Sequence, residues 1–298
     1  MTTSTGNFAE LLWPGIKEIF GHEYSSYEPL YEKIFEKKTS DKAYEKEQGV
    51  TGYPLAGLKD QGAAVSFFDL LQGFQKEYVN VTYGAGGVVT REMYEDDQYN
   101  FINQIPRMLA RSMRETMETT HFNVLNNGFS SETAADGSSV FNATHSLVGG
   151  GTFRNQLQTS ADLTETSLEQ ACIDISDFVD DQNLKIRVFP RKLIVPTALQ
   201  FVAAKILETT QKVGSADNDV NVVRGMIQGD AIVSPYLTDS DAWFIGTDCP
   251  NGLVCYERRA ADLTRDNEFA TENLQFKVTA RWSQGVTDPR GIFGSPGA

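Results

Sequence analysis

The sequence predicts an α+β fold, because three stretches show clear and different patterns. Residues 90–128 carry apolar side chains three or four positions apart, which is the spacing of one helix face. Residues 274–282 alternate strictly between apolar and polar side chains, as in an antiparallel strand with one wet face. Residues 47–90 are divided by glycines into short extended pieces, typical of a long, weakly cored β-hairpin or loop.

The composition is that of an acidic globular protein. The 298 residues are 40% hydrophobic and 22% charged, enough for two domains or one large one. The net charge of −14 argues against a protein that grips nucleic acid, because phosphate binding requires clustered Lys and Arg. No apolar run is long enough to span a membrane and no signal peptide is present, so we expect synthesis in a cytoplasm. Cys172, Cys249 and Cys255 lack metal spacing and are expected to be small buried hydrophobes.

Residues 1–46 are expected to form an arm. Periodic apolar residues predict a short amphipathic helix that Pro14-Gly15 interrupts; these residues are Phe8, Leu11, Leu12, Ile16 and Phe20. The arm has too few apolar residues to fold alone, so we expect it to lie along another surface, such as a neighbouring subunit.

The long helical pattern is expected to begin properly at Pro106, with residues 91–105 as a separate lead-in. Thr90 is a suitable N-cap, and Asn127-Gly128 is a suitable stop. One apolar face is formed by Ile102, Ile105, Leu109, Met113, Met117 and Val124. Two pairs four residues apart are expected on the exposed side, Arg111 with Glu115 and Arg114 with Glu118.

The second half of the chain alternates between helix and strand patterns. Residues 129–160 are rich in Ser, Thr, Gly and Asn and are interpreted as a surface loop. Residues 161–182 predict a helix whose capping box is Thr166 with Glu169. A second helix is predicted at 197–209, and strands at 185–195, 231–237, 242–246 and 252–257.

Few residues indicate chemistry, and we expect no catalytic, cofactor-binding or metal site. The three histidines, His22, His121 and His145, are not in a metal-ligand spacing, and His121 is interpreted as a satisfied histidine near a helix end. His145 lies near Asp136, so a Ser/His/Asp arrangement with Ser138 or Ser146 is conceivable, but no nucleophile-elbow pattern supports it.

Three stretches resemble the major capsid proteins of tailed phages, which have the HK97-type fold. They are YEKIFEKKTSDKAYEKE in the arm, VVTREMYEDDQYNFINQIPRMLARSMRETMETTHFNVLNNGF at the long helix, and ADGSSVFNATH after it. Within that family the chain looks most like the Mu-type major head subunit. The element order agrees over most of the chain, while the residue likeness is confined to these stretches.

The resemblance implies a division of the chain and a set of partners. Residues 1–46 would be the N-terminal arm, 47–90 the extended loop, and 91–160 with 266–298 the peripheral domain. Its spine helix would be 107–127, and 161–265 would form the axial domain. Many copies would form the hexamers and pentamers of an icosahedral shell around packaged double-stranded DNA, with portal, scaffolding and decoration proteins as partners. Contacts between subunits are expected at Lys59, Phe67, Phe68, Phe74, Tyr78, Arg258 and Arg259.

Two other functions stay open at this point. An encapsulin-like compartment has the same fold and encloses a protein cargo. A soluble hydrolase that uses His145 belongs to a different class and predicts a monomer or small oligomer. The shell interpretation is favoured because the arm and the loop cannot build cores of their own.

Overall fold

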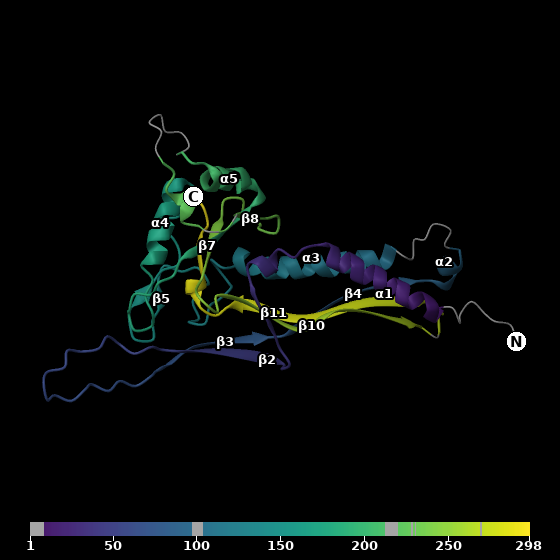
Figure 1. Cartoon of the computed structure of the whole chain (residues 1–298). Helices are drawn as coiled ribbons and strands as arrows, with labels where there is room; N and C mark the ends of the chain where they lie inside the picture. The colour runs from purple at the N-terminus through teal and green to yellow at the C-terminus, as the bar shows by residue number, and fades with distance from the viewer. Residues whose placement is uncertain (1–8, 97–103, 212–219, 228, 230, 269) are drawn as a thin grey trace.

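A long helix lies along a twisted sheet, with a smaller α/β unit above one end and a hairpin projecting below (Figure 1). This computed structural model describes residues 9–96, 104–211, 220–227, 229, 231–268 and 270–298. We call the helix-and-sheet part the plate and the smaller part the upper unit. Within the described residues, no helix combines the length and apolarity needed to cross a membrane.

The long helix α3 spans Gln104–Asn126, and the predicted start near Pro106 is confirmed. Pro106 lies in the first turn, where a missing backbone N–H costs little. A separate short helix, α2 (Arg91–Glu95), precedes it and is capped by the Thr90 side chain, which accepts a hydrogen bond from the Met93 N–H. Ile102 lies outside the described residues. The predicted apolar face is buried at Leu109, Met113, Met117 and Val124.

The plate sheet contains β1 (Glu36–Thr39), β10 (Leu253–Asn267), β11 (Leu274–Val286) and β4 (Val81–Val89), in that order. The pairs β10–β11 and β11–β4 are antiparallel. The alternation predicted for 274–282 is confirmed, since Phe276, Val278 and Trp282 are buried in the same core as α3. Strand β10 runs ten residues beyond its predicted end at Glu257, because two register shifts let its polar second half stay paired with β11.

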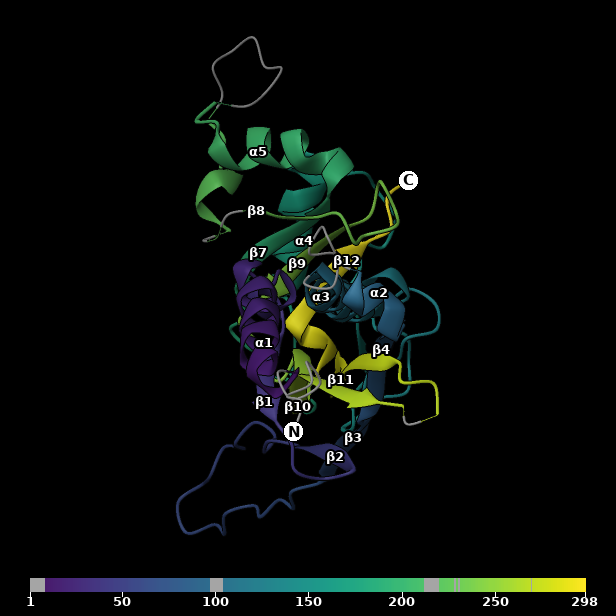
Figure 2. The ribbon, with the colours of Figure 1, turned by 90° about the vertical axis from the view of Figure 1, so that its right-hand side faces the viewer.

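The arm packs on its own chain. Helix α1 (Ala9–Ser26) continues through Pro14-Gly15, so the predicted interruption is wrong. Its Ile16 and Phe20 are buried in the core that contains α3, and Figures 1 and 2 show the two helices side by side. This packing offsets the roughly 3 kcal/mol that a proline costs inside a helix. After the short 3-10 helix η2 (Tyr31–Lys33), β1 pairs in parallel with β10.

The arm also changes the expected charge pairs on α3. Glu118 is buried, and its carboxylate accepts hydrogen bonds from the backbone N–H groups of Leu30 and Tyr31 at 2.7 and 3.1 Å. Arg114 donates to the Tyr27 carbonyl oxygen at 2.7 Å. The prediction of an exposed Arg114–Glu118 pair is therefore wrong, because both side chains hold the arm instead.

Strands β2 (Tyr44–Val50) and β3 (Gln72–Val79) form an antiparallel hairpin that leads into the projecting loop. Residues 51–71 between them contain no helix or strand. Strand β4 follows directly but belongs to the plate sheet. The excursion predicted for 47–90 is therefore confined to β2, β3 and the residues that connect them.

The upper unit is built on a second sheet in the order β12 (Ile292–Ser295), β9 (Trp243–Thr247), β7 (Pro190–Pro196) and β8 (Ala231–Ser234). Helices α4 (Glu165–Ser176) and α5 (Gln200–Glu208) pack on it, with the 3-10 turns η3 (Thr197–Leu199) and η4 (Val223–Gly225). The predicted helices and strands are confirmed. The predicted capping box of Thr166 with Glu169 is wrong. The N-cap is Thr164, and its reciprocal partner is Ser167.

Each of the two sheets draws strands from both sides of residue 265. Strand β10 starts at Leu253 and lies wholly in the plate, while the C-terminal strand β12 lies in the upper unit. The chain crosses between the units at Gly252 and Gly291, whose backbones touch. A Cβ on Gly291 would lie 2.2 Å from the Gly252 Cα, so no side chain fits there.

Candidate assembly interface

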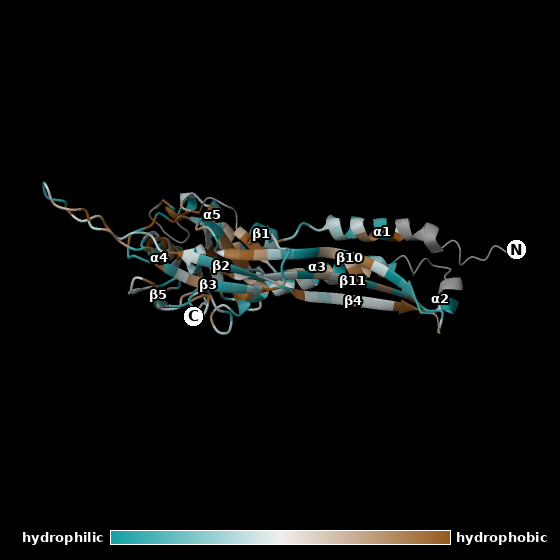
Figure 3. Ribbon diagram, turned by 90° about the horizontal axis from the view of Figure 1, so that it is seen from below, coloured by the Kyte–Doolittle hydropathy of each residue, from teal (hydrophilic) through white to brown (hydrophobic). Residues whose placement is uncertain are grey.

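The loop at residues 51–71 carries the two most exposed large apolar side chains of the described residues. Leu58 is 97% exposed and Phe67 is 94% exposed, and Figure 3 shows hydrophobic residues along this projection. The other exposed apolar residues are Tyr53, Leu55, Val65, Phe68, Leu70 and Leu71. Lys59 is exposed beside them. Surfaces of this kind mark protein–protein contacts, so the structure places Lys59, Phe67 and Phe68 where a neighbour can reach them.

Thr51 and Leu71 close the neck of this loop. The Thr51 N–H and hydroxyl both donate to the Leu71 carbonyl oxygen, each at 3.1 Å. The Leu71 N–H donates to the Thr51 hydroxyl at 3.0 Å. Thr51 is buried although the residues beyond it are exposed. The neck therefore holds the two ends of the loop together without any contribution from its tip.

Glu47 fastens the hairpin to the plate. Its carboxylate accepts hydrogen bonds from Lys38 of β1 and from the Tyr256 hydroxyl of β10, both at 2.5 Å, and from the Thr287 hydroxyl. Burial raises the pKa of Glu47, but the hydrogen bonds from Lys38, Thr287 and Tyr256 outweigh it, and the net shift is downward. The carboxylate is thus held ionised by three donors from three parts of the chain.

Tyr78 also attaches the hairpin to the plate and is not exposed on the surface. Its ring packs on Tyr256 with 5.2 Å between centroids, and its hydroxyl donates to the Thr287 hydroxyl at 2.5 Å. Only 2% of Tyr78 is exposed. The prediction that Tyr78 contacts a neighbour is therefore wrong, because the alternation of β3 turns this side chain toward its own plate. Phe74, on the same side of β3, is half-buried.

Replacing Glu47 by Gln is expected to lower the free energy of unfolding by about 2 kcal/mol at neutral pH, because charge-assisted hydrogen bonds are lost. The folded pKa is depressed, so the stabilisation is present above the unfolded value and disappears as pH falls through the folded value. Urea unfolding at pH 7 and pH 3 measures this difference. Glu77→Gln, in an exposed pair with Lys46, is the matched control and should change stability by less than about 0.5 kcal/mol.

Arg258 and Arg259, two of the expected contact residues, lie on β10 at its register shifts. Arg259 is exposed and donates to the Thr279 hydroxyl at 3.0 Å, while Arg258 is half-buried. Both lie on the plate sheet, and the structure does not bring them together with the tip of the loop. They form a separate basic pair on the plate.

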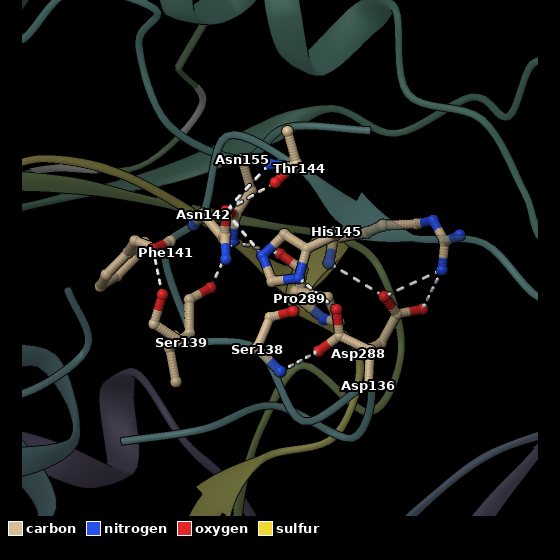
Figure 4. Close-up of polar contacts among 12 residues, drawn as sticks. Asp136, Ser138, Ser139, Phe141, Asn142, Thr144, His145, Asn155, Asp288 and Pro289 are labelled. Atoms are coloured by element: carbon tan, nitrogen blue, oxygen red, sulfur yellow. Dashed lines mark hydrogen bonds and ion pairs between the residues drawn. The ribbon is translucent and has the colours of Figure 1, made fainter. Parts of the chain in front are cut away.

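Asp136 and His145 do meet, as the hydrolase alternative required, but without a serine (Figure 4). His145 Nδ1 lies 2.8 Å from Asp136 Oδ2, and His145 Nε2 lies 3.0 Å from Asn155 Oδ1. The Ser138 N–H donates to the other oxygen of Asp136. His145 is fully buried. Its second nitrogen is occupied by Asn155, so this group cannot activate a nucleophile, and the interpretation of 129–160 as a surface loop is wrong here.

Asn155 is the central residue of this network, and sequence reasoning missed it. Its amide nitrogen donates to the carbonyl oxygens of Val140, Pro289 and Ile292, at 2.7, 3.0 and 3.1 Å. Its oxygen accepts from the Asn142 N–H at 2.9 Å as well as facing His145. Three carbonyl partners fix the orientation of the amide, so both His145 nitrogens face acceptors. The network joins the loop after α3 to the start of β12.

His121 is also structural, as predicted. It is fully buried and stacks on Tyr31 with 4.1 Å between ring centroids. Nδ1 donates to the Met117 carbonyl at 2.6 Å, and Nε2 lies 2.9 Å from Cys255 Sγ. Burial lowers the pKa of His121 to about 4, so the ring is neutral at pH 7. Within the described residues, no group of three or more His, Cys, Asp or Glu side chains is arranged to hold a metal.

The cysteines are free, and the prediction that they are buried is confirmed for Cys172 and Cys255, while Cys249 is half-buried. Burial raises the pKa of Cys172 to about 11 and that of Cys255 to about 12. Since the thiolate is the reactive form, we expect both to resist maleimide at pH 7.5 in the native protein and to react within minutes in guanidinium. Mass spectrometry counts the labelled thiols. Rapid native labelling at either residue would contradict this packing.

A plate with a spine helix, an upper unit and a projecting apolar hairpin are the parts expected of a capsid subunit with the HK97-type fold. A family model described as phage capsid protein matches residues 75–294. The chain belongs to the phage capsid protein family, and it is a major capsid protein that builds the shell of a virion. No curated protein matches the chain.

Solved structures share this fold at low sequence identity. The capsid of cyanophage P-SCSP1u is 10% identical, with a TM-score of 0.60 over 92% of this chain and 90% of that one. The decorated capsid of bacteriophage JBD30 is 12% identical, with a TM-score of 0.59 over 80% of this chain and 100% of that one. A virus-like particle from Pyrococcus furiosus is 12% identical, with a TM-score of 0.54 over 94% and 97%. The predicted fold is confirmed.

Proposed function

We propose that this chain forms the hexamers and pentamers of an icosahedral phage head that encloses packaged double-stranded DNA. The observation that carries the proposal is the anchored hairpin. Its base is fastened to the plate by Glu47 and Tyr78, while its tip carries Leu58 and Phe67 into solvent with no core of its own. An anchored hairpin with an apolar tip adds nothing to the core of its own subunit but can bury area against a neighbour.

The proposal assigns each part of the chain to a domain of the capsid subunit. The arm is 1–46, the extended loop lies within 47–90, and the spine helix 107–127 belongs to the peripheral domain of 91–160 and 266–298. The axial domain is 161–265, with β10 assigned to the peripheral sheet and β12 to the axial sheet. Lys59, Phe67 and Phe68 make the contacts of the loop, and Arg258 and Arg259 offer a second contact on the plate.

The finer identity proposed is a Mu-type head subunit, made in the host cytoplasm. Portal, scaffolding and decoration proteins are its further partners. The net charge of −14 suits a wall that touches packaged DNA without holding it tightly. We propose that the chain works without catalysis, since the His145–Asp136 pair is sealed inside the fold by Asn155.

Particle imaging tests the proposal. The chain is expressed with and without a scaffolding protein, and the products are examined by negative-stain microscopy and by nucleic-acid content. Shells tens of nanometres across are expected in the presence of scaffold, with DNA inside those assembled during infection. Small oligomers under every condition would refute the shell. Particles filled with a protein cargo and free of DNA would refute the head and favour a compartment.

A further inference from the structure

Two places on the upper unit combine exposed apolar side chains with a charged group. The first is a groove of about 430 Å³ between α4 and η4, which we call the α4 groove. Its lining is mainly apolar, and Ile173, Val222 and Met226 are each more than half exposed. Glu169 also lines it. An open, mainly apolar groove with acidic residues at its edge is a surface that a partner covers, because leaving apolar area in water is costly.

The second place is α5, where Phe201 is 71% exposed. Lys205 is exposed one helical turn further on, and residues four apart lie on the same side of a helix. Phe201 and Lys205 together form what we call the α5 knob, an aromatic ring beside a cation. Across the described residues, no ion pair holds Lys205 or Glu169, so the charges of the knob and the groove are both available.

Neither Phe201 nor Lys205 lines the α4 groove of its own chain. In Figure 1, α4 runs down the side of the upper unit and α5 lies across its top, and η4 contacts both helices. Two complementary patches on different sides of one subunit produce a head-to-tail contact between copies, and such contacts close into rings when the rotation allows. Rings of upper units are what a shell built from hexamers and pentamers requires.

We propose that the α4 groove of one copy receives Phe201 of the next copy in the ring, with Lys205 facing Glu169. This inference rests on the proposed function as a shell subunit and specifies the surface through which its rings form. An aromatic ring is the side chain that most often anchors such a groove, and the ion pair at its edge fixes the register.

The charges exclude the symmetric alternative. If two α4 grooves met face to face, Glu169 would oppose Glu169 of the other copy, and like charges at an interface are unfavourable. Asp177 also lines the groove and adds further negative charge, although Lys185 pairs with it at 2.6 Å. A basic partner is therefore favoured over a second groove, and the α5 knob supplies one.

Charge reversal tests the contact. Glu169→Lys and Lys205→Glu are each expected to lower shell yield at least about tenfold, and the double variant should recover it to within about twofold of wild type. Phe201→Ser should lower yield without rescue. Asp239→Lys, which makes the same charge change at an exposed position between β8 and β9, is the control. Circular dichroism and thermal unfolding confirm that every variant is folded.

The outcomes separate this inference from the proposed function. If folded single variants assemble as wild type does, or if the double variant stays as defective as the singles, the knob-in-groove contact is wrong. If wild type itself forms no shell with scaffold present, the proposed function fails first. If wild type forms shells and the charge variants form them equally well, the knob-in-groove contact is wrong while the proposed shell function stands.

Discussion

Replacing residues 52–70 by an Asn-Gly turn is expected to abolish shell assembly while the subunit stays folded. Thr51 and Leu71 already pair at the neck through three hydrogen bonds. An Asn-Gly dipeptide is a common two-residue turn between neighbouring antiparallel strands. The deletion removes Leu58, Phe67 and the rest of the apolar tip, none of which contributes to a core. We expect thermal unfolding of the isolated subunit to shift by only a few degrees.

The measurement is shell yield by sedimentation and microscopy, beside the unfolding curve. Phe67→Ser and Lys59→Ala in the full-length loop are the graded controls, with a large and a small expected effect on yield respectively. Normal shells from the shortened chain would show that the loop does not hold neighbours together. Loss of the folded subunit would instead show that the neck depends on the tip.

Asn155→Ala is expected to lower the free energy of unfolding by about 4 kcal/mol. The change removes a hydrogen-bond partner from three carbonyl oxygens, from the Asn142 N–H and from one nitrogen of His145. The Pro289 oxygen keeps the Ile292 N–H, whereas each buried group left without a partner costs about 1–3 kcal/mol unless water reaches it. The loss should appear as a lower midpoint in urea with an unchanged slope.

Asn267→Ala is the matched control, because Asn267 is exposed at the end of β10. It should alter stability by no more than about 0.5 kcal/mol. An equal decrease in the free energy of unfolding in both variants would mean that the hydrogen bonds of Asn155 do not stabilise the fold more than those of an exposed asparagine. The two units are joined through Pro289 and Ile292, so we also expect Asn155→Ala to make residues 289–295 exchange amide hydrogens faster.

The long helix and the last long strand were predictable because their patterns are local. The face of α3 and the alternation of β11 each repeat within one element, and burial follows from the period alone. Pro106 was also informative, since a proline costs least in the first turn of a helix. In these segments, neighbouring residues carry most of the information that decides the structure.

The errors arose where partners lie far away in the sequence. Tyr78 sits in a polar, alternating strand, and its hydroxyl partner Thr287 is 209 residues away. Helix α1 survives Pro14 because it packs on α3, which no local pattern reveals. Asn155 was one polar residue among many, and two of its three carbonyl partners are 134 and 137 residues distant. The spacing of Asp136 and His145 hinted at a contact but not at its burial.

The backbone contact between Gly252 and Gly291 has a consequence for curvature. The plate and the upper unit meet there main chain against main chain, so no side chain fits at this point, while Phe141, Phe244 and Ile292 pack beside it in the core that contains α3. In the proposed shell, the angle between the two parts of each subunit contributes to the local curvature. We expect a methyl group at either glycine to force the two parts to open, and particle radius measured by electron microscopy to change with it.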